Sequence, residues 1–116
     1  MTALPLDLDP TRIDVRAATS ADGALITVSG EIDSTTAPGL RTCLLEVLDR
    51  PGTVTVEVDL TGVTFLDSAG LSALATAHRT ADSAGRRLTM RCGSARAVLR
   101  PLQITGLWSV FSVVDA

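Results

Sequence analysis

The chain has 116 residues, enough for one domain with a single core of two packed layers and too few for a second domain. Hydrophobic residues make up 46% of it and aromatic residues only 3%, so the core is expected to consist of Leu, Val, Ile and Ala. The net charge is -3 and the arginines are spread from Arg12 to Arg100, which argues against nucleic-acid binding through a basic face.

Residues 1–11 are expected to form a flexible amino-terminal segment ahead of a strand over residues 12–18, where apolar and polar side chains alternate. A turn over residues 20–23 leads into a second strand over residues 24–33, so these two strands are expected to form an antiparallel hairpin. Within residues 34–48 the apolar side chains recur every three or four positions, which predicts a first helix with its proline in the first turn.

A third strand is predicted over residues 53–60, where valines alternate with polar residues. Residues 62–66 are expected to form a connector in which Phe65 and Leu66 look exposed. A second helix is predicted to follow over residues 68–84, because its apolar residues recur at helical spacing and a glycine comes directly after it.

A short strand over residues 86–92 and a third helix complete the expected elements, with Ser94 as the cap of that helix and Gly106 after its end. Pro101 falls inside this helix, where a proline costs about 3 kcal/mol, so the helix is expected to be kinked or to begin later than Ser94. Residues 109–114 suit an edge strand. The order of elements predicts one α/β domain with a mixed sheet of four to five strands and helices packed on it.

Metal and membrane chemistry find little support in the sequence. The amino-terminal stretch "MTALPLDLDP" is acidic where a signal peptide is basic, and no later apolar run approaches membrane-spanning length. Cys43, Cys92 and His78 are too few soft ligands for a metal site, and both cysteines are expected to be small buried residues. We therefore expect a cytoplasmic protein with no cofactor, no metal and no membrane contact.

The join between the third strand and the second helix, Asp67-Ser68, has three interpretations. Ser68 can be an N-cap whose hydroxyl accepts a hydrogen bond from a first-turn amide, which is worth about 1 kcal/mol over alanine. A nucleophile is disfavoured, because His78 lies about two and a half turns along the same helix and no G-x-S-x-G motif is present. Thirdly, the positive end of a helix favours an added phosphate, which makes Ser68 a candidate phosphoacceptor.

The stretch "LTGVTFLDSAGLSALATAHR" resembles the signature of the STAS domain, in the branch of bacterial anti-sigma factor antagonists, and "VSGEIDSTTAPGLRTCLLEVL" resembles the other characteristic stretch of that family. The resemblance implies that Ser68 is phosphorylated by an anti-sigma factor with serine kinase activity. It also implies a partner switch, in which the unphosphorylated protein binds this kinase and frees the sigma factor. The phosphorylated protein then binds again only after a serine phosphatase has acted.

The resemblance further implies a partner-binding surface around the phosphoacceptor. Asp33 matches the acid that the family places near the phosphoacceptor, although a turn or cap residue is the alternative. Asp67 is expected to orient the serine hydroxyl, contact the kinase or complement the helix dipole, and Phe65 and Leu66 are either partner anchors or core residues. The expected surface comprises Asp33, Ser34, Thr35, Thr36, Phe65, Leu66, Asp67, Ser68, Ala69, Gly70 and Leu71.

The function expected on this basis is that of a phosphorylation-gated antagonist, which is a substrate and a ligand but not an enzyme. The alternative is a non-switching STAS scaffold or accessory subunit of a stress-signalling or lipid-transport complex. An enzyme ranks third, because the sequence shows no acid/base pair and no phosphate-binding glycine loop. Two features depart from the family pattern, Pro101 and the end of the chain at Ala116, where many members continue into a further helix.

Overall fold

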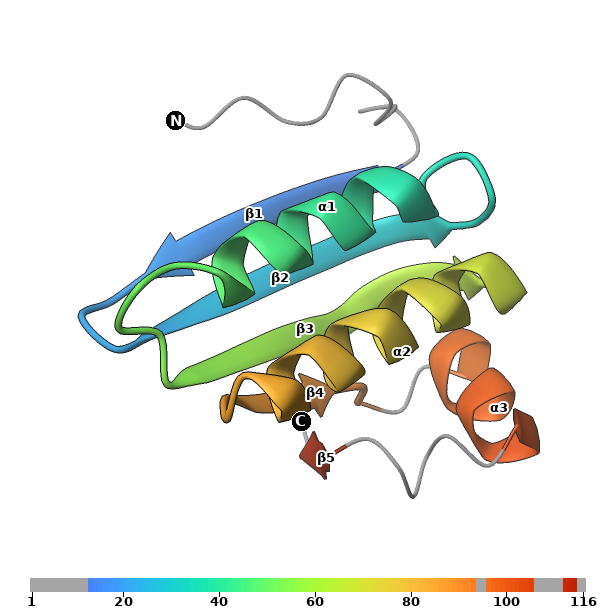
Figure 1. Cartoon of the computed structure of the whole chain (residues 1–116). Coiled ribbons are helices and arrows are strands. Elements are labelled where there is room, and N and C mark those ends of the chain that lie inside the picture. Colours follow the sequence, from blue (N-terminus) through green and yellow to red (C-terminus); the bar gives the residue numbers. More distant parts are fainter. Residues whose placement is uncertain (1–12, 94–95, 106–111, 115–116) are drawn as a thin grey trace.

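A five-stranded sheet forms the centre of the fold in the computed structural model, which describes residues 13–93, 96–105 and 112–114. In chain order the elements are β1 (Ile13–Thr19), β2 (Gly23–Ile32), α1 (Ala37–Leu48), β3 (Thr55–Leu66), α2 (Ser68–Ser83), β4 (Arg87–Arg91), α3 (Arg96–Thr105) and β5 (Ser112–Val114). The strands lie in the order β1-β2-β3-β4-β5, and α1 and α2 lie side by side over one face of the sheet (Figure 1). The expected α/β fold with a mixed sheet is confirmed.

The sheet is mixed because its first two strands form a hairpin. β1 and β2 pair antiparallel, with Ile13 opposite Gly30, and in the turn the amide of Ser20 donates to the carbonyl of Gly23 at 2.9 Å. The pairs β2-β3, β3-β4 and β4-β5 are all parallel. Parallel neighbours need right-handed crossovers, so strands that are added in one direction place α1 and α2 on the same face.

The core lies between the sheet and the helices and is aliphatic among the residues that the structure describes. Side chains alternate along β2 at Ile26 and Val28 and along β3 as far as Leu60, so every second residue there points toward the helices. The fully buried side chains include Ile26, Val28, Val56, Val58, Leu60, Leu40, Leu44 and Leu74. Burial of an aliphatic side chain of this size stabilises the fold by about 1.5–3 kcal/mol.

β3 is longer than the sequence pattern predicts, because residues 62–66 continue the strand and do not form a connector. Its buried residues Leu60, Val63 and Leu66 are spaced by three, which breaks the period of two that marks a strand. The register against β2 shifts twice along this segment, and each shift adds one residue on β3. These two bulges therefore explain why the expectation of a connector was wrong, and also why Leu66 is buried.

The helix boundaries agree with the expectations to within a few residues. α2 covers Ser68–Ser83 and is followed by Gly85, which has a φ of 71°. α3 covers Arg96–Thr105 with Pro101 inside it, and the expected start relative to Ser94 lies outside the described residues. β5 lies at the edge of the sheet, as expected, and pairs in parallel with β4. The expected roles of residues 1–11, Ser94, Gly106 and 109–111 lie outside the described residues.

Candidate functional site

Ser68 is exposed and is the first residue of α2, at the end of the sheet where β2 and β3 both finish (Figure 1). The pairing of these two parallel strands extends to Ile32 opposite Leu66. Beyond that pair, the amide of Asp67 donates to the carbonyl of Ile32 at 3.2 Å. The turn that leads into α2 and the loop that leads into α1 are therefore held next to each other.

Asp67, and not Ser68, is the N-cap of α2. Its backbone is extended, and its Oδ1 accepts hydrogen bonds from the amides of Ala69 at 2.9 Å and Gly70 at 3.1 Å. The interpretation of Ser68 as a cap is therefore wrong. The Ser68 hydroxyl forms no hydrogen bond with any residue in the described part of the chain.

Gly70 fixes the start of α2 against the strand ends. A Cβ at this position would lie 2.5 Å from Cδ1 of Leu66 and 2.7 Å from Cγ2 of Ile32, so the helix approaches the sheet as closely as it does because no side chain is present. Gly70 and Leu71 are both buried, as is Leu66. Within the surface expected from the sequence, these three residues support Ser68 from beneath.

Asp33 organises the loop between β2 and α1. Its Oδ1 accepts from the amides of Thr35 at 2.9 Å and Thr36 at 3.1 Å, which confirms its interpretation as a turn residue. Thr36 is fully buried, and its hydroxyl donates to the carbonyl of Glu31 at 2.8 Å and accepts from the amide of Asp33 at 2.9 Å. The loop is thus tied down at several points, while Ser34 and Thr35 stay exposed.

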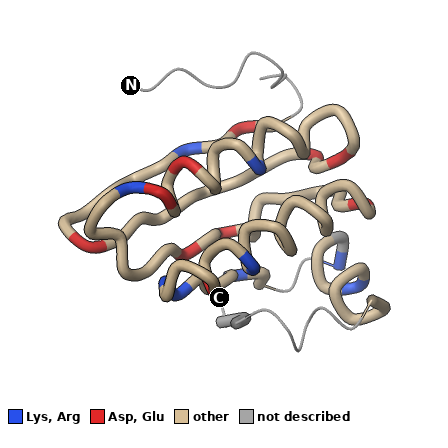
Figure 2. Tube along the Cα trace, in the orientation of Figure 1, with Lys and Arg blue, Asp and Glu red and all other residues tan. Residues whose placement is uncertain are grey.

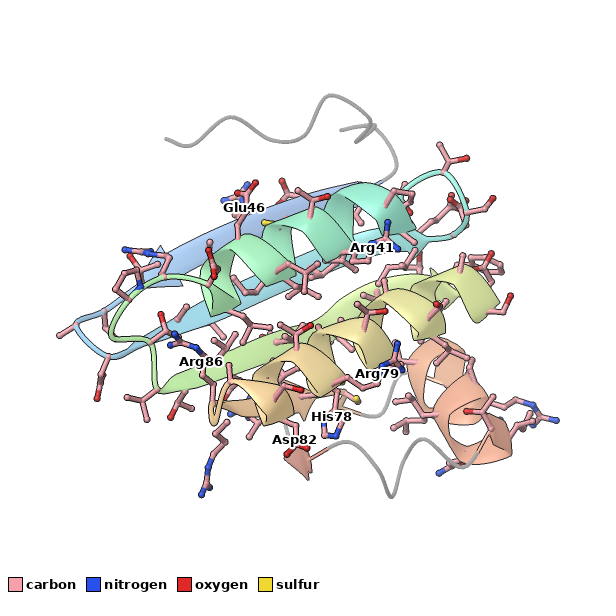
Figure 3. All side chains as sticks on the ribbon, in the orientation of Figure 1. Arg41, Glu46, His78, Arg79, Asp82 and Arg86 are labelled. Carbon is pink, nitrogen blue, oxygen red and sulfur yellow. The ribbon has the colours of Figure 1, made fainter. Side chains whose placement is uncertain are left out.

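The two segments that the sequence singles out meet at a cleft of about 190 Å³ between the starts of α1 and α2. Ser34 contributes from the first segment and Ala69 from the second. Arg41 of α1 also lines this cleft, and Figure 3 shows it near the first turn of that helix. The residues around Asp33 and those around Ser68 therefore share one surface, as the resemblance implies.

A second concavity lies on the other side of the Asp67-Ser68 turn, where α3 packs against the end of β3. This depression, which we call the α3 groove, has a volume of about 430 Å³. It is lined by Phe65, Leu66, Arg96, Arg100, Pro101 and Ile104. Residue spacing does not reveal this groove, because the groove depends on how α3 packs. Its one signal in the sequence is the apolar pair Phe65-Leu66.

Charge is unevenly distributed around this end of the molecule. Figure 2 shows acidic residues in the loop before α1 and at the start of α2. The charged residues on α3 are all basic. These acidic and basic residues are Asp33, Asp67, Arg96 and Arg100. This end of the molecule therefore carries a negative region and a positive region.

Ser68 lacks the neighbours that a catalytic serine needs. His78 lies in the second half of α2 near Asp82 (Figure 3), and its position ten residues along the helix places it roughly 15 Å from Ser68.

Burial raises the pKa of the Cys92 thiol to about 11, and burial together with nearby Glu46 raises the pKa of Cys43. Both thiols are thus protonated and unreactive near neutral pH.

A cluster of metal ligands and a membrane-spanning helix are both absent from the described residues. No group of three or more His, Cys, Asp or Glu side chains is placed to hold a metal ion within residues 13–93, 96–105 and 112–114. In the same part of the chain, no helix has both the length and the apolar character needed to cross a membrane.

Comparison with known proteins gives concordant matches. The family described as "Mlab, STAS domain" matches residues 10–112. The anti-sigma-B factor antagonist of Listeria monocytogenes is 32% identical over 88 residues, which is 76% of this chain and 75% of that protein. The structure of an anti-sigma factor antagonist from Mycobacterium paratuberculosis is 28% identical with a TM-score of 0.79, and the match covers 91% of this chain and 88% of that one.

Two further structures share the fold at lower identity. The anti-sigma factor antagonist SpoIIAA in its unphosphorylated form matches with a TM-score of 0.75 at 18% identity, over 89% of this chain and 88% of that one. The Bacillus cell fate determinant SpoIIAA in its phosphorylated form matches with a TM-score of 0.69 at 17% identity, over 89% of this chain and 91% of that one.

Proposed function

The chain belongs to the STAS domain family, and we propose that it is an anti-sigma factor antagonist which phosphorylation of Ser68 switches off. In the unphosphorylated form it binds an anti-sigma factor that is also a serine kinase, so that the sigma factor is released. The phosphorylated form does not bind until a serine phosphatase removes the phosphate. The protein thus works in the cytoplasm as a ligand and a substrate, without enzymatic activity of its own.

The observation that carries this proposal is the exposed, uncommitted hydroxyl of Ser68. Asp67 caps α2, so a phosphate on Ser68 would not break the hydrogen bonds that cap this helix. An exposed serine on a rigid turn can enter the active site of a kinase without unfolding its surroundings. Phosphorylation is therefore expected to change the surface of the protein and not its fold.

The local electrostatics favour a loss of binding on phosphorylation. A phosphate adds about -1.5 to -2 charges at neutral pH. The helix start returns only about 0.3–1 kcal/mol, and the Asp67 carboxylate already occupies the amides of Ala69 and Gly70. A partner carboxylate about 7 Å away would feel roughly 2.4 kcal/mol of repulsion per added charge at an effective dielectric constant near 20. A net loss near 3 kcal/mol weakens binding more than about 100-fold.

The structural relatives agree with a switch that keeps the fold. SpoIIAA shares the fold of this chain in structures described as unphosphorylated and as phosphorylated. A domain of this architecture thus accommodates a phosphate without losing its sheet and helices. This supports a switch that acts at the partner interface.

A non-switching STAS subunit is the second candidate, favoured by the family description that names Mlab. In that case Ser68 is never modified and serves only as part of a binding surface. The two candidates share a fold, so only chemistry at Ser68 separates them.

The test is incubation of the purified protein with its candidate anti-sigma factor kinase and ATP, followed by intact mass and by measurement of binding. Wild type is expected to gain one phosphate and Ser68→Ala none, while Ser68→Ala still binds. Ser68→Asp is expected to bind far more weakly. Ser34→Ala is the matched control, because Ser34 is also exposed and follows an acid in the neighbouring turn. No mass gain in wild type, with equal binding by all variants, would contradict the switch.

A further inference from the structure

Two large apolar side chains are exposed in the α3 groove. Phe65 is 47% exposed and Ile104 is 72% exposed, and the two line the same depression together with the ring of Pro101. Within the described residues four large hydrophobic side chains are at least 38% exposed, and Phe65 and Ile104 are two of them. Their meeting in one concavity is a feature of binding surfaces.

The same groove carries positive charge that nothing in the described part of the chain neutralises. Arg96 and Arg100 lie one turn apart on α3 and both are exposed. Neither forms an ion pair with a described residue. None of the described residues that line the groove is acidic, although the whole chain has a net charge of -3. The groove therefore combines an apolar floor with a positive rim.

We propose that the α3 groove docks a segment of the anti-sigma factor in which bulky apolar side chains alternate with Asp or Glu. The apolar side chains would pack on Phe65 and Ile104, and the carboxylates would pair with Arg96 and Arg100. This inference rests on the proposed function and adds to it the chemistry of the partner segment. A basic segment is excluded as an occupant by repulsion from both arginines.

The position of the groove links it to the switch. Leu66 lines the groove and Ser68 follows two residues later, which limits the separation of their Cα atoms to about 7 Å. A segment that fills the groove therefore comes close to Ser68 at the Leu66 end. A phosphate on Ser68 then repels carboxylates of the segment that lie at this end.

Binding of the full-length chain to the candidate anti-sigma factor kinase, without ATP and at low and high salt, tests the groove. Reversal of both rim charges in Arg96→Glu/Arg100→Glu is expected to weaken binding at least about tenfold at low salt and to reduce its salt dependence. Phe65→Ser is expected to weaken binding about tenfold or more, as loss of a buried aromatic anchor does. Both variants change surface residues, and thermal unfolding is measured to check that they remain folded.

The matched control is Arg50→Glu/Arg87→Glu, which changes the net charge by the same amount at the opposite end of the sheet. Both of these arginines are exposed and lie beside the starts of β3 and β4. This variant is expected to bind within about twofold of wild type. If it weakens binding as much as the rim reversal, net charge and not the groove governs association, and the proposal is overturned.

The failures of the two proposals look different. If wild type gains a phosphate with ATP and binds the kinase without ATP, while the groove variants bind equally well, only the groove proposal is overturned. Wild type that neither binds nor gains phosphate overturns both. A photo-crosslinker at position 104 is expected to capture an acidic segment of the kinase; capture of residues 106–111 of the same chain, or of a second copy, would instead show that this chain covers its own groove.

Discussion

Asp33 and Asp67 make the same pair of hydrogen bonds at the ends of two neighbouring parallel strands. Each follows the last residue of its strand, and these last residues, Ile32 and Leu66, are paired in the sheet. In both cases Oδ1 accepts from the amides two and three residues ahead, at 2.9 and 3.1 Å. An exposed serine follows each acid. The surface around Ser68 is thus framed by two equivalent turns that carboxylates hold in place.

Replacement of the cap tests which residue starts α2. Asp67→Ala is expected to lower the free energy of unfolding by about 1 kcal/mol, within a range of about 0.5–2, because two first-turn amides lose their acceptor. Ser68→Ala should change it by less than about 0.5 kcal/mol, since no described residue bonds to this hydroxyl. Urea denaturation measures both. An equal loss in the two variants would return the cap to Ser68.

The buried hydroxyl of Thr36 is expected to matter more than its size suggests. Thr36→Val keeps the shape but leaves the carbonyl of Glu31 and the amide of Asp33 without this partner. The expected cost is about 1–3 kcal/mol in the free energy of unfolding. Thr42→Val is the control, since the exposed Thr42 hydroxyl bonds only to a carbonyl of its own helix. A similar cost for both would contradict a special role of the Thr36 hydroxyl in the loop.

Much of this fold is predictable from the sequence, because the hairpin of β1 and β2 and the two long helices follow clean periods of two and three to four. The end of β3 was missed because two bulges shift its alternation, so Leu60, Val63 and Leu66 are buried at a spacing that no regular strand shows. Pairing with β2 determines that this segment is a strand, and the sequence of the segment alone does not contain that information.

The sequence singles out residues that meet at the ends of β2 and β3, but it does not assign their structural roles. Asp67 and Ser68 are both of a residue type that caps helices well. Which of them is the cap depends on where α2 begins, and this is fixed by the close approach of Gly70 to Ile32, a residue 38 positions earlier. The α3 groove likewise arises from the packing of one helix against the end of a distant strand. Tertiary contacts, which residue spacing does not encode, assign these roles.

Gly70→Ala provides a test whose sign differs from that of ordinary helix propensity. In a free helix, alanine in place of glycine stabilises by about 1 kcal/mol. Here the new methyl group would lie within 2.7 Å of Leu66 and Ile32, so a loss of about 1–3 kcal/mol is expected. Ser72→Ala, at an exposed site of the same helix, is the control and should be neutral or slightly stabilising. Stabilisation by Gly70→Ala would contradict the close approach.

Stability at alkaline pH is expected to depend on Cys92. The chain contains no Lys and no Tyr, so above pH 9 the thiols are the groups that titrate below arginine. Burial raises the pKa of Cys92 from 9.0 to about 11 in the folded protein. Between these values the folded state holds a proton that the unfolded state has lost. The stability contributed by this proton is fully present below about pH 9 and falls by up to about 1.4 kcal/mol per unit as the pH rises toward 11.

Urea denaturation of wild type and Cys92→Ala between pH 8 and 11.5 measures this effect. Cys92→Ala is expected to be less stable at pH 8, because it loses packing in a fully buried position, but to show a flatter dependence on pH. Cys43→Ala is the comparison, since the pKa of Cys43 is also raised but its side chain is only partly buried, so its removal should leave most of the slope. A slope that is unchanged in Cys92→Ala would assign the alkaline loss to another group and show that the Cys92 thiol ionises without cost to the fold.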